Sequence, residues 1–186
     1  IAVISRMFGE GNKEKAAHYG RLLLMTACAM GVSINVLLFS AASALMRFMG
    51  AEGDVLREAV VYLKISSFEM LPLFLFSAFC AIRQAMVDMV IPVIFSLIAA
   101  VVNITLIAVL VMGFGLGARG AAIASVAGQL SILPFYGKRL LKDGGDDFSI
   151  RGELKPDKKG LALLFRIAAP SVASQVVGSF GFIILQ

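Results

Sequence analysis

Long uncharged runs separated by short polar segments dominate the chain. The longest run covers residues 89–118, and a second apolar run begins at Gly120, close after the glycine-rich stretch at residues 113–117. A bilayer core about 30 Å thick is crossed by about 20 apolar residues of helix. The pattern therefore predicts a transmembrane hairpin in which two helices are joined by a tight glycine turn.

The same alternation continues on both sides of this hairpin. Residues 22–46 carry no charge, and an apolar stretch at residues 60–82 is interrupted only by Lys64 and Glu69. Residues 142–159 form the single long polar segment, which we expect to be a solvated loop. The sequence predicts helices over residues 1–8, 12–50, 54–86, 89–112, 120–141 and 160–186.

Two of these helices have candidate N-caps. Asn12 precedes the first complete span, and Glu14 lies in its first turn, where an acid favours the helix dipole. Asp54 follows the turn at residues 50–53 and is the expected cap of the next helix.

Composition agrees with a membrane protein. The chain is 59% hydrophobic and 16% charged, with mean hydropathy +0.90, whereas soluble domains are about 45–50% apolar and about 25% charged. We therefore expect an all-α, polytopic transmembrane bundle in a lipid bilayer. Since the chain starts at Ile1 and stops inside an apolar run, we also expect it to be a fragment of a longer protein.

The basic residues are unevenly divided between the two sides of the predicted bundle. Thirteen of the seventeen lie on one side and four on the other, namely Arg47, Arg57, Lys64 and Arg119. Because basic residues collect in cytoplasmic loops, residues 9–20, 83–88 and 142–159 are predicted to be cytoplasmic and the protein to lie in the cell (inner) membrane. This bias also accounts for the net charge of +5 without a nucleic-acid partner.

Nothing in the sequence favours an enzyme, a metal site or a cofactor. His18 is the only histidine, and no nucleophile or carboxylate forms a catalytic pattern with it. Cys28 and Cys80 lie in apolar runs without metal-like spacing. The string Gly115-x-Gly117-x-x-Gly120 matches a dinucleotide fingerprint, but it lacks the preceding short strand and the following acid.

Polar residues inside the predicted spans are the candidate site. Asn103 lies mid-helix, where a buried amide either bonds a neighbouring helix or lines a water-filled cavity. Glu69 lies about 22 Å along its helix from Asp54, well inside the hydrocarbon. We expect Glu69 to face the interior near Asn103 as a proton or cation carrier, or alternatively to bond a neighbouring helix and only stabilise the bundle.

Small residues recur at four-residue spacing on the predicted helix after the glycine turn. Gly120, Ala124 and Gly128 fall on one stripe. Small residues let the backbones of membrane helices approach closely, so this stripe predicts a packed helix face.

An ordered set of motifs resembles the multidrug and toxic compound extrusion (MATE) family of transporters. Each motif is short, but together they follow the family's order along almost the whole chain. They are Ile4-Ser-Arg-Met-Phe-Gly-Glu-Gly-Asn-Lys-Glu-Lys-Ala16; Ala59-x-x-Tyr62-Leu63; Ala81-Ile-Arg83 with Asp88 and Pro92; Asn103-Ile-x-Leu106 with Gly117-x-x-Gly120-Ala-Ala-x-Ala-Ser125; and Pro170 with Gln175.

The resemblance implies a twelve-helix antiporter with two six-helix lobes. Residues 1–141 would form most of the N-terminal lobe, from the end of helix 2 to helix 6. Residues 142–159 would be the cytoplasmic interlobe loop, and residues 160–186 the first helix of the C-terminal lobe, most of helix 7. The implied function is export of small cationic or amphipathic organic compounds, driven by inward sodium or proton flow.

This chain departs from the family at the implied N-lobe cation site. Asn103 matches the family's asparagine, but Ile107 stands where an aspartate is expected and Ser125 where a threonine is expected. A lipid-linked oligosaccharide flippase of the wider superfamily is the alternative function, although the spans 22–46 and 89–118 lack the Lys or Arg that would hold a pyrophosphate. A membrane scaffold without transport is a third class, and intramembrane Asn and Glu count against it.

Overall fold

The computed structural model describes residues 2–142, without the side chains of residues 2, 3, 13, 141 and 142. The span predicted over 160–186 and the loop predicted over 142–159, apart from residue 142, lie outside this part. The regular elements of the described chain are all helices, which confirms the all-α prediction. Its elements are α1 (Ala2–Gly9), α2 (Lys13–Phe48), α3 (Gly53–Ser67), α4 (Met70–Ala85), α5 (Val90–Ile107), the π-helical turn η1 (Ala108–Gly113) and α6 (Gly117–Lys142).

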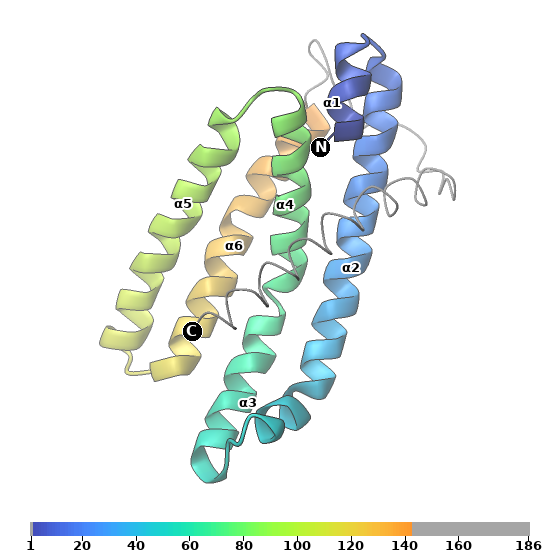
Figure 1. Ribbon diagram of the computed structural model, residues 1–186. Coiled ribbons are helices and arrows are strands. Elements are labelled where there is room, and N and C mark those ends of the chain that lie inside the picture. Colours follow the sequence, from blue (N-terminus) through green and yellow to red (C-terminus); the bar gives the residue numbers. More distant parts are fainter. Residues whose placement is uncertain (1, 143–186) are drawn as a thin grey trace, which may run out of the picture.

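The long helices stand side by side as a bundle (Figure 1). The α4–α5 turn and the end of α6 lie at the same end as α1, whereas the α2–α3 and α5–α6 turns lie at the opposite end. Four segments of the described chain are long and apolar enough to cross a membrane: Glu14–Phe48, Gly53–Ala85, Val90–Gly113 and Gly117–Leu140.

One of the two predicted caps is confirmed. The Asn12 side chain accepts a hydrogen bond from the Lys15 backbone N–H, at 3.3 Å, at the start of α2. The prediction for Asp54 is wrong, because α3 already begins at Gly53 and Glu52 occupies the cap position without a side-chain bond. Gly53 adopts φ +58°, a conformation open to glycine, and this moves Asp54 into the first turn.

The single helix predicted over residues 54–86 is interrupted between Ser67 and Met70. Pro72 has no N–H for the carbonyl of Phe68, and its ring disfavours a regular turn there. The chain tightens instead, so that Phe68 N–H donates to Ile65 O at 3.1 Å and Glu69 N–H donates to Ser66 O at 3.0 Å. The break separates α3 from α4 and gives Glu69 a position outside both helices.

Side chains from two other helices hold the backbone around this break. Asn35 of α2 donates through Nδ2 to the Ser67 carbonyl at 2.9 Å. The Tyr136 hydroxyl of α6 donates to the Pro72 carbonyl at 3.4 Å. A helix interruption inside a membrane needs such partners because no water is available to satisfy its carbonyl groups.

Glycines set the closest helix contacts. A Cβ at Gly128 would lie 3.0 Å from Cβ of Asn103 and 3.2 Å from the Ala99 carbonyl oxygen, so α6 touches the backbone of α5. Ala124 is fully buried, and the predicted packed stripe is confirmed. A second close approach was not predicted: a Cβ at Gly31 of α2 would lie 2.9 Å from Cα of Leu71 in α4.

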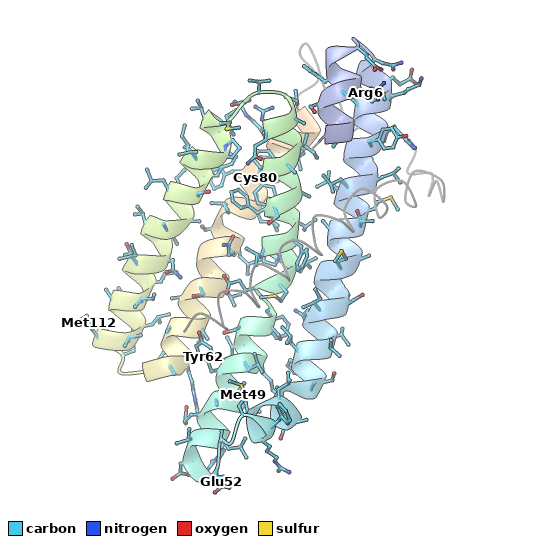
Figure 2. The ribbon with its side chains drawn as sticks, in the orientation of Figure 1. Arg6, Met49, Glu52, Tyr62, Cys80 and Met112 are labelled. Carbon is cyan, nitrogen blue, oxygen red and sulfur yellow. The ribbon has the colours of Figure 1, made fainter. Side chains whose placement is uncertain are left out.

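A cluster of aromatic rings forms the core between α4, α5 and α6. Phe79 is fully buried, and its ring centroid lies 5.8 Å from that of Phe95 and 5.4 Å from that of Tyr136. Phe76 joins the same cluster through Phe79 and Tyr136. The rings occupy the region around Cys80 in the half of α4 that leads to the α4–α5 turn (Figure 2).

Candidate functional site

A cavity of about 310 Å³ opens among the α3–α4 break, α4, α5 and α6. Its polar lining includes Glu69, Asn103 and Ser125, so the structure brings all three sequence-predicted site residues to one place. Glu69 is the one charged residue among the described residues that line it. The complete lining is Glu69, Phe76, Ser96, Ala99, Ala100, Asn103, Ser125, Gly128 and Gln129.

The helix break positions Glu69. Glu69 N–H donates to Ser66 O in the tightened turn, and Glu69 O accepts from Leu73 N–H at 3.0 Å in the first turn of α4. The bonds from Asn35 and Tyr136 fix the backbone on either side of it. Glu69 therefore lines the cavity from the break that precedes Pro72, a signal in the sequence that would have predicted the interruption.

Asn103 and Ser125 meet across the α5–α6 contact. Asn103 Nδ2 donates to Ser125 Oγ at 3.3 Å, and the missing side chain of Gly128 lets the two helices come this close. Both residues also line the cavity. The two interpretations of Asn103, a bond between helices and a place in a cavity wall, are thus compatible in this structure.

The lining contains polar residues that the sequence-based selection omitted. Gln129 lies four residues after Ser125 and so shares its face of α6; this spacing was the signal that could have found it. Within the described residues, Gln129 Oε1 is buried and has no hydrogen-bond donor. Ser96 also lines the cavity and donates through Oγ to the Pro92 carbonyl at 2.9 Å.

The aspartate that the family resemblance implies at position 107 has no replacement on α5. Ile107 is half-buried and lies outside the cavity lining. The carboxylate of this cavity comes instead from the break between α3 and α4. Within residues 2–142 no group of three His, Cys, Asp or Glu side chains could hold a metal ion, so the chemistry of the site is that of one acid among amide and hydroxyl groups.

Comparison with known proteins agrees with this architecture. The sequence profile of the MatE family matches residues 1–110, more than half of the chain. The chain belongs to the MatE family. This MatE chain is 27% identical over 184 residues to "Probable multidrug resistance protein YoeA" of Bacillus subtilis (strain 168). The alignment covers 95% of this chain and 40% of that relative, so the MatE chain spans about two fifths of its relative's length.

Solved structures show the same fold in this MatE chain. A multidrug resistance MATE family transporter in an inward-facing conformation matches with TM-score 0.84 at 23% identity, covering 94% of this chain and 40% of that one. An outward-facing conformation matches with TM-score 0.83 at 24% identity, covering 93% and 39%. The predicted family and the multi-pass helical bundle are therefore confirmed, and the fold of this part is alike in both conformations.

Proposed function

We propose that this chain forms most of the N-terminal lobe of a secondary transporter that exports small cationic or amphipathic organic compounds by cation-coupled antiport. The observation that carries the proposal is the polar cavity with one carboxylate, Glu69, inside an otherwise apolar bundle. Membership of the MatE family and likeness to a protein named for multidrug resistance support it. Residues 142–159 would be the interlobe loop and residues 160–186 the first helix of the second lobe.

The alternative function, a lipid-linked oligosaccharide flippase, receives less support. A pyrophosphate carries several negative charges and needs basic side chains around it. Neither Lys nor Arg occurs among the described residues that line the cavity, and the acid Glu69 would repel an anion. A cationic compound suits this lining better because its charge is attracted to the same carboxylate.

We assign the coupling step to Glu69, with Asn103 and Ser125 beside it. A carboxylate inside a membrane is costly unless it faces a cavity, a cation or a proton. Glu69 faces the cavity, so uptake of a proton or a sodium ion would relieve this cost, and release would restore it. Asn103 and Ser125 offer oxygen atoms in the same lining, which suit a hard cation such as sodium.

The test is Glu69→Gln in the complete transporter, reconstituted in proteoliposomes. Glutamine keeps the size and hydrogen-bonding capacity of the side chain and removes its titration. We expect transport driven by an imposed proton or sodium gradient to fall by an order of magnitude or more, while the protein remains folded. Glu52→Gln is the matched control, because Glu52 is exposed at the α2–α3 turn and makes no side-chain cap bond.

The result that contradicts this assignment is equally definite. If Glu69→Gln transports at the wild-type rate with unchanged pH and sodium dependence, Glu69 only stabilises the bundle. The coupling carboxylate would then belong to a part of the transporter outside residues 2–142.

A further inference from the structure

We propose that Gln129 is a specificity-determining residue, which accepts a hydrogen bond from an N–H or O–H group of the transported compound. The proposal rests on the proposed function and adds a selection rule to it. Gln129 lines the same cavity as Glu69 but has a different role. Glu69 provides charge, whereas Gln129 distinguishes compounds of equal charge by their hydrogen-bond donors.

The carbonyl oxygen of Gln129 is the reason. Oε1 is buried and receives no hydrogen bond from the described residues, although buried acceptors in folded proteins are nearly always paired. Leaving such a group unpaired costs stability. Because Gln129 lines the cavity, a rotation of its amide group turns this oxygen to the cavity, where a donor of a bound compound provides the partner that the empty protein lacks.

Two neighbouring side chains donate to protein acceptors. Asn103 Nδ2 donates to Ser125 Oγ at 3.3 Å, and Ser96 Oγ donates to the Pro92 carbonyl at 2.9 Å. When it is ionised, a carboxylate such as Glu69 accepts hydrogen bonds and donates none. Gln129 Oε1 and the Glu69 carboxylate are thus two acceptors that an occupant with donors can satisfy.

An apolar wall stands in the same lining. Phe76 contributes to the lining and belongs to the aromatic cluster, with ring centroids 6.2 Å from Phe79 and 5.7 Å from Tyr136. Because those partners are buried, the Phe76 ring is held in place and offers a surface to an aromatic compound. A flat aromatic amine satisfies both the ring and the Gln129 oxygen.

The experiment compares two cationic probes that differ in donors. Ethidium carries two aromatic amino groups, whereas tetraphenylphosphonium carries neither N–H nor O–H. Transport of each is measured in proteoliposomes that contain the complete transporter, as wild type and as Gln129→Met, which preserves the length of the side chain and removes the amide. The KM for ethidium is expected to rise about 3- to 10-fold, the equivalent of one lost hydrogen bond, and the KM for tetraphenylphosphonium to stay unchanged.

Two further variants make the result decisive. Gln129→Leu is a second apolar replacement, measured in case the methionine variant does not fold, with the same expectation. Thr105→Val is the control: Thr105 is an exposed polar residue of α5 that bonds the Val101 carbonyl and lies outside the cavity lining. Its loss should change neither KM.

The outcomes separate the two proposals. Equal changes in KM for both probes would mean that Gln129 bonds another part of the protein. No change in KM for either probe would mean that its amide takes no part in binding. Each result overturns the inference and leaves the proposed exporter function standing. Failure of the wild type to transport either probe would overturn the proposed function itself, and the selection rule with it.

Discussion

Gly31 offers a direct test of how closely α2 and α4 are packed. In the structure, a Cβ placed on Gly31 would lie 2.9 Å from Cα of Leu71 and 3.4 Å from the Met70 carbonyl oxygen. Carbon atoms in contact normally lie about 3.5–4.0 Å apart. Gly31→Ala therefore requires the two backbones to separate by roughly 0.6 Å or more, because the obstructing atom is a backbone atom and has no other rotamer.

The magnitude follows from a comparison with a second helical glycine. Overpacking a close contact costs about 1–3 kcal/mol, while replacing glycine by alanine inside a helix contributes about 0.5–1 kcal/mol of stability. No atom lies within 4 Å of a Cβ placed on Gly137 of α6. Gly137→Ala should therefore gain the stability of a helical alanine without any cost of overpacking. The free energies of unfolding of the two variants should differ by about 1–3 kcal/mol, with Gly31→Ala the less stable.

The assay is thermal unfolding of the purified complete transporter in detergent. Samples are heated, and the fraction that remains monodisperse is measured by size-exclusion chromatography. We expect the thermal midpoint of Gly137→Ala to lie at or above that of the wild type, and the midpoint of Gly31→Ala to lie below it. A midpoint for Gly31→Ala equal to or above that of Gly137→Ala would refute the close approach of α2 to α4.

Two further predictions concern the ends of the bundle. In a cysteine-free background, Phe114→Cys should react with an impermeant maleimide in intact cells and Glu14→Cys should not, because the basic residues favour a cytoplasmic α2 start; the reverse labelling would invert the topology. Arg119 of α6 and Glu58 of α3 form a two-bond ion pair at 2.9 and 2.6 Å, half-exposed, so Glu58→Arg should lower stability by about 1 kcal/mol or less. The double variant with Arg119→Glu should restore it, and a thermal midpoint that the second change does not raise would argue against the pair.

Local signals explain why much of the fold was predictable. Charge-free runs of membrane length located the helices, Asn12 capped α2 as expected, and glycines at residues 115 and 117 adopt the positive φ values of a tight turn. Small residues at Gly120, Ala124 and Gly128 identified the face of α6 that packs. Each of these features depends on neighbours within a few residues, which a single sequence displays.

Other features depend on residues far apart in the chain. The bond from Asn35 to Ser67 spans 32 residues, and the Gly31–Leu71 approach depends on which helices are neighbours; helical periodicity does not contain this information. The break before α4 is different, since Pro72 was visible in the sequence and its effect was missed. Asn103 and Glu69 were selected as isolated polar residues in apolar runs, and Ser125 was selected through the family resemblance. Gln129 shares the Ser125 face of α6 and lines the same cavity, but it was not selected.

The bond from Asn35 to the α3–α4 break also indicates how deep the break lies between the two membrane surfaces, and thus how much of the membrane potential acts on a cation bound there. Along α2, Asn35 lies 14 residues after Arg21 and 12 before Arg47, or about 21 and 18 Å from the charged limits of the apolar segment. In a bilayer centred on this apolar segment, the break and Glu69 would lie near the midplane. A monovalent cation that reached Glu69 from either surface would cross about half of the membrane potential, which is worth roughly 1.1 kcal/mol per 100 mV. The dissociation constant for this cation would consequently change about sixfold for each 100 mV, even if Glu69 itself never moved.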